Sequence, residues 1–180
     1  MKILVQAQKI KKEYSGQTIF SGLSFTVSLK QKIGLIGING SGKSTLFRII
    51  AGLEEASDGQ LIIHQDTHLA YLTQMEDWQD EETALDYLIR KAGCPDWEAK
   101  KLASRFQLDA NKLSMRAESL SGGWRMRLRL CGVLLKQPNL LLLDEPSNYL
   151  DLNTLILLEN YLKSYRQSFI IISHDREFLK

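Results

Sequence analysis

The sequence has 180 residues and is 44% hydrophobic, which is enough for the core of one ordinary globular domain. Its 23 Lys and Arg residues nearly balance 21 Asp and Glu residues, and the net charge of +2 neither indicates nor excludes a nucleic-acid-binding protein. No apolar run approaches the ~18 residues that span a bilayer, and the first residues become polar too soon for a signal peptide; we therefore expect a cytoplasmic protein without direct membrane insertion.

The N-terminal part of the chain predicts short strands. Two segments alternate apolar and polar residues, as half-buried antiparallel strands do, and a Tyr-Ser-Gly-Gln turn separates them. A more continuous apolar segment predicts a central strand, and a helix with apolar residues at helical spacing follows it over 44–52. The predicted strands are 3–10, 23–29, 32–37, 60–63 and 68–72. We expect the first, fourth and fifth of them to form an antiparallel flap.

Charged, helical sequence begins near residue 81. A Gly-Cys-Pro break at 93–95 divides the first helical region, and Asp96 is expected to cap the helix that continues to Phe106. Ser121 is expected to cap a helix through Lys136. Three further elements are predicted, namely strands at 140–144 and 169–173 and an amphipathic helix at 153–165.

Buried strands that alternate with helices predict an α/β fold. We expect a mostly parallel sheet, an antiparallel β subdomain and a small α-helical subdomain. The core with the β subdomain is expected at about 1–74 and 137–180, and the helical subdomain at about 75–136.

Residues 37–44, Gly-Ile-Asn-Gly-Ser-Gly-Lys-Ser, match the pattern G-x-x-x-x-G-K-[ST] between a predicted strand and a predicted helix. The glycines allow backbone N–H groups to converge on phosphate oxygens at the positive end of the helix. Lys43 is expected to reach the β- and γ-phosphates of a nucleotide, and Ser44 to bind Mg²⁺. A glycine-rich turn with a chance Lys-Ser is the alternative, and the flanking strand and helix count against it.

Asp144 and Glu145 follow the buried run Leu-Leu-Leu-Leu, at the carboxyl end of a strand. Ligands of open α/β sheets bind at this edge. Asp144 is suited to a direct or water-mediated contact with Mg²⁺, and Glu145 to polarising an attacking water. A solvated loop start is the alternative for an isolated acidic pair, and the phosphate-binding pattern in the same chain disfavours it.

His174, at the end of the strand in "FIIISHD", is a candidate to bond the γ-phosphate or to orient Glu145 and its water. His64 and His68 are expected to be structural, because nothing around them is typical of a site. Cys94 and Cys131 lack metal-ligand spacing and are expected to be idle thiols in a reducing compartment.

These ordered motifs resemble the nucleotide-binding domain of the ATP-binding cassette (ABC) superfamily, which has a P-loop NTPase core, and the likeness covers nearly the whole chain. "GINGSGKST" resembles the Walker A loop, "LLLLDE" the Walker B strand, "LSGG" the signature loop and "SHD" the switch-histidine loop. The resemblance places Gln74 where the family has its Q-loop glutamine, which contacts Mg²⁺. It places Tyr14 where the family stacks an aromatic ring on adenine, although a packing tyrosine at a strand end is the alternative.

The signature loop has a particular role in this family. It resembles the element that reaches the γ-phosphate of ATP held by a second cassette in a head-to-tail dimer, and Asp151 lies where the D-loop crosses that interface. Ser121 offers a hydroxyl, Gly122 and Gly123 allow close backbone approach, and the following helix points its positive end at the phosphate. The resemblance thus implies a second cassette as partner, in the same protein, in a homodimer or in a partner chain.

The expected ligands are ATP and Mg²⁺. The expected catalytic residues are Lys43, Glu145 and His174. The expected metal-binding residues are Ser44, Gln74 and Asp144. The expected nucleotide-contacting residues are Tyr14, Gly37, Asn39, Gly40, Ser41, Gly42, Lys43, Ser44, Thr45, Gln74, Ser121, Gly122, Gly123 and Asp151.

Within the superfamily, "LSGGWRMRL" and "EPSNYLD" resemble the first cassette of ABC-F proteins, twin-cassette ATPases that act on ribosomes. The usual ABC-F pattern is Glu-Pro-Thr-Asn-His-Leu-Asp, from which this sequence departs at Ser147 and Tyr149. The chain ends soon after His174, where such cassettes continue, so we expect it to be part of a longer protein. A ribosome is a possible partner by this resemblance.

Two other functions stay open: the ATPase subunit of a transporter that docks on a transmembrane partner, and a module that binds ATP without hydrolysing it. The alternating arginines Arg125, Arg127 and Arg129 also permit a nucleic-acid interpretation, but a solvated or interface-facing helix is favoured. The tryptophans are expected to be packing residues rather than base-stacking platforms.

Overall fold

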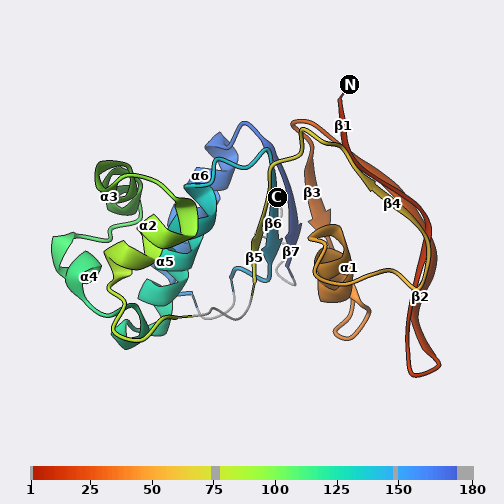
Figure 1. Cartoon of the computed structure of the whole chain (residues 1–180), viewed down its shortest axis with the longest axis horizontal. Helices are drawn as coiled ribbons and strands as arrows, with labels where there is room; N and C mark the ends of the chain where they lie inside the picture. Colours follow the sequence, from red (N-terminus) through yellow and green to blue (C-terminus); the bar gives the residue numbers. More distant parts are fainter. Residues whose placement is uncertain (1, 74–77, 148–149, 174–180) are drawn as a thin grey trace. The chain divides into compact units, whose positions relative to one another are not determined.

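The computed structural model describes residues 2–73, 78–147 and 150–173, and the chain divides into two compact units (Figure 1). The first unit comprises residues up to Tyr71, Pro138–Glu145 and the residues from Arg166 onward. The second comprises Leu72–Gln137 and Pro146–Tyr165. The helix within 146–165, which the sequence analysis places with the core, therefore groups with the other helices.

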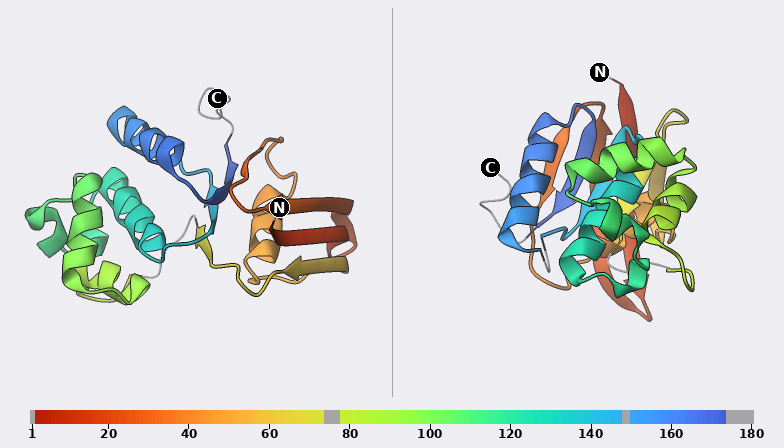
Figure 2. Two further views of the ribbon diagram at one scale, coloured as in Figure 1. Left: turned by 90° about the horizontal axis from the view of Figure 1, so that it is seen from above. Right: turned by 90° about the vertical axis from the view of Figure 1, so that its left-hand side faces the viewer.

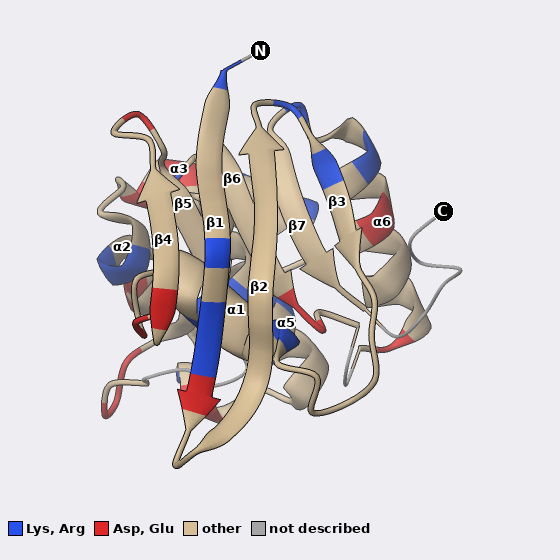
Figure 3. Cartoon of the chain, turned by 90° about the vertical axis from the view of Figure 1, so that its right-hand side faces the viewer, with Lys and Arg blue, Asp and Glu red and all other residues tan. Residues whose placement is uncertain are grey.

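An antiparallel sheet in the first unit consists of β1 (Ile3–Tyr14), β2 (Gln17–Ser28) and β4 (Asp58–Ile63), in the order β2-β1-β4 (Figure 3). A tight turn joins β1 to β2, so that Tyr14 pairs with Gln17. The prediction that the strand at 68–72 joins this flap is wrong, and the strand at 23–29 belongs to it instead.

The second sheet of the first unit has the order β3-β7-β6-β5. Its strands are β3 (Lys32–Leu35), β5 (Leu69–Leu72), β6 (Leu140–Asp144) and β7 (Ser168–Ile172). β7 runs parallel to both β3 and β6, so the predicted parallel α/β core is confirmed. The strand expected to be central, β3, is instead at one end of the order among the described strands.

β5 joins this second sheet because the chain before it is anchored to the start of β6. The backbone carbonyl of His68 accepts hydrogen bonds from the N–H groups of Asn139 and Leu140, at 2.9 and 3.3 Å. The side-chain Oδ1 of Asn139 in turn accepts a hydrogen bond from the N–H of His68 at 2.9 Å. These contacts between residues about 70 positions apart explain why local alternation alone assigned the strand to the wrong sheet.

Helix α1 (Lys43–Ile50) packs its apolar face into the core of the first unit. The core residues come from both sheets and from the helix, which ties the two sheets together through one continuous cluster. Its fully or nearly fully buried members are Leu4, Val5, Ala7, Ile10, Val27, Leu46, Phe47, Ile50, Leu140, Leu142, Ile170 and Ile172. Burying each Leu, Ile, Val or Phe side chain of this cluster contributes ~1.5–3 kcal/mol relative to exposure.

The second unit is helical, as predicted, and α2 and α3 both contact α5 (Figure 2). Its elements are α2 (Ala84–Ala92), α3 (Asp96–Arg105), α4 (Ala110–Ser114), the short 3₁₀ helix η1 (Ala117–Ser119), α5 (Gly122–Leu134) and α6 (Leu152–Ser164). The side chain of Thr83 caps α2, and Gly93 ends it in the left-handed conformation. Pro95, not Asp96, is the N-cap of α3.

The arginines of α5 do not form the solvated face that the sequence predicts. Arg127 and Arg129 are buried, with 5% and 8% of their surface exposed, and only Arg125 is exposed. Apolar and basic positions alternate along this helix, but neighbouring segments enclose it from more than one side. The burial of Arg127 is explained by the partners described below.

None of the helices within the described ranges combines the length and the apolar character that crossing a membrane requires.

We expect Glu82→Ala to destabilise the chain by about 2 kcal/mol, the scale of hydrogen bonds to a charged group. Glu82 is buried, and Arg90 donates to its two oxygens at 2.5 and 2.8 Å, which lowers the pKa of the carboxyl group. This contribution is present above the unfolded-state pKa of about 4.3 and is lost as the pH falls through the lower folded-state pKa. Urea unfolding followed by circular dichroism measures both effects.

The matched control is Asp96→Ala, which removes an exposed ion pair with Lys100 at 2.9 Å. An exposed pair contributes about 1 kcal/mol or less, so this change is expected to cost less than Glu82→Ala. An equal loss of unfolding free energy for the two substitutions would contradict the conclusion that the buried bonds between Glu82 and Arg90 stabilise α2.

Candidate nucleotide-binding site

The phosphate-binding pattern forms the connection between β3 and α1, as predicted. The Lys43 ammonium turns back over this loop and donates to the carbonyls of Gly37 and Ile38, both at 2.8 Å. Gly42 is the N-cap of α1 and has no side chain to accept from the first turn. The N–H groups at the start of α1 are therefore available to an anion, in the arrangement that favours phosphate.

Gly42 is the position at which this loop requires glycine. Its φ of +87° lies in the left-handed region, and a Cβ there would come within 2.5 Å of Ile19 Cγ2 and 3.0 Å of Phe20 Cδ1. Strand β2 of the antiparallel sheet thus supports the loop from one side. Ile19, which the sequence analysis did not single out, fixes how closely the loop approaches β2.

Asp144 ends β6 as a buried carboxylate. The Tyr71 hydroxyl donates to its Oδ2 at 3.1 Å, and Ser44 also forms a side-chain hydrogen bond to it. Burial raises the pKa of the Asp144 carboxyl group, an effect that these two bonds oppose. Asp144 Oδ1 is buried and has no hydrogen-bond partner among the described residues. Tyr71 is a residue of the site that the sequence analysis missed.

Glu145 follows directly and takes a left-handed backbone conformation, with φ of +46°. A non-glycine residue in this region is strained by about 1–2 kcal/mol. The Glu145 N–H donates to the carbonyl of Ile172 at 3.0 Å, which holds the turn at the end of the parallel sheet.

The structure brings Glu145 and the phosphate-binding loop to the same hollow, of about 350 Å³. The lining residues are Ile19, Asn39, Gly40, Gly42, Lys43, Ser44, Thr45 and Glu145. Gly37 and Ser41 belong to the same loop, and a Cβ on Gly37 would lie 3.0 Å from Ser41 Oγ.

Tyr14, at the end of β1, is 44% exposed and does not line this hollow. Its hydroxyl bonds to Glu54, and the Lys12 ammonium lies 4.9 Å from the centre of its ring. The Glu54 carboxylate also forms ion pairs with Lys12, at 2.8 Å, and with Arg48, at 3.2 Å. The hydrogen bonds from Lys12 and Tyr14 lower the pKa of this carboxyl group. Glu54 therefore orients the Tyr14 ring, a role that no sequence pattern indicated.

The signature loop and Asp151 lie in the second unit. Ser121 is exposed at the N-terminus of α5 and its side chain forms no capping bond there. Asp151 caps α6, and its two oxygens bond the N–H and hydroxyl of Thr154 at 3.0 and 2.8 Å. A Cβ on Gly123 would come within 3.1 Å of Asp151 Oδ2, so the absence of a side chain at 123 lets this loop lie against Asp151.

Arg127 ties these two segments together. Its Nε donates to Thr154 Oγ1 at 2.7 Å, its Nη1 donates to Gln107 Oε1 at 2.8 Å, and its Nη2 lies 3.6 Å from Asp151 Oδ1. The guanidinium also stacks over the Trp124 ring at 4.4 Å. These partners account for the burial of a charge that the sequence analysis had placed in solvent.

Gln74, Tyr149 and His174 lie outside the described residues. The remaining predicted site residues divide between the units: the Walker A loop, Asp144, Glu145 and Tyr14 are in the first, whereas Ser121, Gly122, Gly123 and Asp151 are in the second. Cys94 and Cys131 form no disulfide.

The model of the ABC transporter family matches residues 20–148 of this chain, which include the phosphate-binding loop, the Asp-Glu pair and the signature loop.

Two similar curated proteins come from different kingdoms. The energy-dependent translational throttle protein EttA of Escherichia coli (strain K12) is 36% identical over 184 residues, covering 98% of this chain and 33% of that protein. ABC transporter F family member 5 of Arabidopsis thaliana is 32% identical over 222 residues, covering 97% of this chain and 32% of that protein. The chain thus spans about a third of the length of these relatives.

Among solved structures, a bacterial Atm1-family ABC exporter with ATP bound superposes with a TM-score of 0.86 over 99% of this chain and 36% of the exporter chain. The sequence identity is 20%, so this likeness establishes the fold alone.

We expect Gly42→Ala to lower nucleotide affinity on the order of 10- to 100-fold, because the added Cβ displaces the loop from β2. Isothermal titration with ATP measures the loss. The control is Gly52→Ala, at a glycine with a similar φ of +69° but no atom within 4 Å of the added Cβ. Because both variants carry the backbone strain, equal affinities would show that the contact with Ile19 does not shape the loop.

Proposed function

The chain belongs to the ABC transporter family, as an ATPase domain with ABC-F homologues, and from this premise we propose that it binds ATP with Mg²⁺ and hydrolyses it as one cassette of a ribosome-associated, cytoplasmic ABC-F-type protein. The observation that carries the proposal is the convergence of Glu145 and the phosphate-binding loop on one hollow, beside a buried aspartate. A phosphate-accepting loop and a carboxylate suited to activate water are two of the recurring parts of sites that hydrolyse nucleotides.

The residues of this hollow have different roles in the proposed reaction. Lys43 and the N–H groups of the loop hold the phosphates and stabilise the charge that develops on them. Glu145 acts as the general base that orients and polarises the attacking water, and His174 assists it at the γ-phosphate. The strained backbone of Glu145 supports this role, because such strain concentrates at functional positions. Tyr14 stacks on adenine, with Glu54 and Lys12 fixing its ring.

The residues present fit Mg²⁺. The metal is typically held by one or two carboxylates and hydroxyls together with substrate phosphates, rather than by a cage of protein ligands. Asp144 Oδ1 is buried without a partner among the described residues, and Ser44 bonds the same side chain. Within the described part of the chain, no cluster of three or more His, Cys, Asp or Glu side chains offers a competing site. Ser44, Asp144 and Gln74 would hold the ion, which would neutralise phosphate charge.

The signature loop completes a site on a second cassette. Ser121 and Gly122 are exposed, so their hydroxyl and N–H groups remain accessible to a phosphate that the chain's own loop does not hold. Asp151 lies against this loop at Gly123, and Arg127 approaches Asp151 from α5. The second cassette is supplied by the same protein, by another copy of the chain or by a partner chain, and closure on it excludes water from the reaction.

The alternative is an ATPase subunit that energises a transmembrane partner. The ABC-F relatives favour the translational assignment, because EttA is by name a translational throttle protein and its similarity extends over 98% of this chain. The structural likeness to an exporter carries less weight, because at 20% identity it reflects only the shared fold.

We expect Tyr14→Ala to lower ATP affinity roughly tenfold, the scale of one lost base–aromatic stacking contact. Tyr14→Phe is the matched control, since it keeps the ring and removes only the hydroxyl bonded to Glu54. Calorimetric titration with ATP and ADP compares the variants. Unchanged affinity of Tyr14→Ala for both nucleotides would remove the ring from the adenine site.

We expect Glu145→Gln to retain ATP binding and to slow turnover by roughly 10²- to 10⁴-fold, the usual contribution of a positioned general base. Phosphate release under saturating ATP and Mg²⁺ measures turnover, and calorimetry measures binding. A wild-type protein that binds ATP but releases no phosphate in the presence of its second cassette would instead indicate a regulatory module.

The cellular assignment is tested by fractionating lysates that contain the Glu145→Gln protein with ATP. Co-sedimentation with ribosomes that disappears when ATP is omitted supports the ABC-F function. Recovery with membranes, together with a transmembrane protein, would support the transporter alternative.

A further inference from the structure

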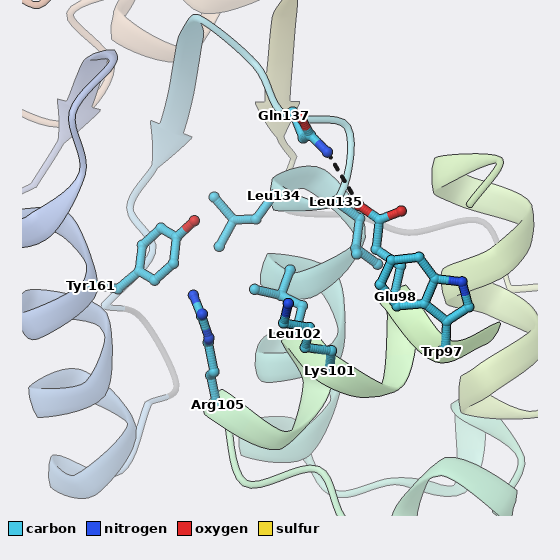
Figure 4. A pocket seen from close by; sticks show the side chains of 9 residues that line it. All are labelled: Trp97, Glu98, Lys101, Leu102, Arg105, Leu134, Leu135, Gln137 and Tyr161. Atoms are coloured by element: carbon cyan, nitrogen blue, oxygen red, sulfur yellow. Dashed lines mark hydrogen bonds between the residues drawn. The ribbon is translucent and has the colours of Figure 1, made fainter. Parts of the chain in front are cut away.

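A hollow of about 310 Å³ lies among the helices of the second unit and contains none of the residues assigned to ATP (Figure 4). Its walls come from α3, the end of α5 and α6, so it is formed within one unit. The hollow is close to the lower end of the ~300–1,000 Å³ range of ligand pockets, which is room for one planar ring but not for a helix.

One wall carries an exposed tryptophan. Trp97, at the start of α3, is 65% exposed, so the prediction that it is a packing residue is wrong. The other two tryptophans do pack: the Trp78 ring lies 4.7 Å from that of Tyr87, and Trp124 lies under Arg127. The Trp97 ring therefore lies beside the hollow with most of its surface accessible to a flat ligand.

Two cationic side chains lie on the same side of α3 as Trp97. Lys101 and Arg105 follow it at spacings of four residues, so the three side chains lie on the same side of the helix, about one turn apart. Both are exposed, and neither has an ion pair with an acidic side chain among the described residues. Their neighbour Lys100, in contrast, is paired with Asp96 at 2.9 Å.

The floor of the hollow is apolar. It is formed by Leu102, Leu134, Leu135 and the half-buried ring of Tyr161, and burial raises the pKa of the Tyr161 hydroxyl. The one acidic side chain of the lining, Glu98, accepts a hydrogen bond from Gln137 at 3.1 Å (Figure 4). An apolar floor below exposed cations suits a ligand that has both a flat apolar face and negative charge.

We propose that this hollow binds single-stranded RNA, with a base stacked on Trp97 and seated over the apolar floor, and with Lys101 and Arg105 holding successive phosphates. Aromatic platforms beside a line of cations are the general means of binding single strands. A helical acidic segment would need an apolar groove longer than this hollow. A flat ring beside two cations matches a base and its phosphates, and an extended acidic peptide offers no ring to stack on Trp97. The inference goes beyond the proposed ATPase function, because it requires neither ATP nor a second cassette.

The test is fluorescence anisotropy of a labelled, unstructured RNA of about ten nucleotides with the nucleotide-free protein at about 50 and about 200 mM salt. Trp97→Ala is expected to weaken binding roughly tenfold. Lys101→Glu and Arg105→Glu are each expected to weaken binding and to flatten its salt dependence by about one phosphate contact. Because these side chains are exposed, the variants should unfold at the same temperature as the wild type, which circular dichroism checks.

Lys163→Glu is the matched control for charge. Lys163 is exposed on α6, two residues beyond Tyr161 and therefore on the other side of that helix, and pairs with Glu159. It is expected to change RNA affinity less than twofold. An equal loss from Lys163→Glu and Lys101→Glu would show that net charge alone acts, and unchanged binding by Trp97→Ala would also overturn the proposal.

A labelled acidic peptide of similar charge provides the other comparison. Binding of the peptide but not of RNA, with dependence on Trp97, would make the hollow a protein-docking surface and overturn the RNA assignment. ATP turnover of the same variants is measured in parallel and is expected to stay at the wild-type level. Loss of RNA binding with normal turnover separates a failure at this surface from a failure of the proposed ATPase function.

Discussion

The burial of one carboxylate oxygen at the end of β6 is the constraint on which the site in the first unit depends. Asp144 Oδ1 has no hydrogen-bond partner among the described residues, and an ionised carboxylate in such a position is costly until a cation compensates it. Tyr71 and Ser44 bond the same side chain and hold it where the phosphate-binding loop begins its helix. The next residue, Glu145, adopts a strained conformation that directs the chain toward the same hollow. The first unit thus places a buried, uncompensated carboxylate oxygen beside the loop and the carboxylate that line the hollow.

The second unit also contains a buried charge, that of the Arg127 guanidinium. Arg127 is buried because Thr154, Gln107 and Asp151 all accept or approach its guanidinium. These contacts join α5, which follows the signature loop, to the start of α6, so the loop and Asp151 are held against each other. In the function proposed above, these contacts would hold the phosphate-contacting groups of the loop in place before a second cassette binds.

Much of the fold and of the first half of the site was predictable from the sequence, because the decisive signals are local. The spacing of glycines and Lys43 requires a strand before it and a helix after it, and both are present. The buried strand at 140–144 has the predicted bounds, since a short apolar run ending in two carboxylates has few alternative structures. The sequence by itself therefore determined the strand–loop–helix around residues 37–44, the position of the acidic pair at the end of β6, and the family.

Only the tertiary structure decided which strands share a sheet, which charges are buried and which aromatic ring is exposed. β5 pairs beside β6 because Asn139 anchors the chain before it, about 70 residues away. Arg127 is buried and Trp97 exposed against their local patterns, and Glu54 orients Tyr14 without any motif to indicate it. The physical reason is the same in each case: burial and pairing depend on groups distant in the chain, which local periodicity does not encode.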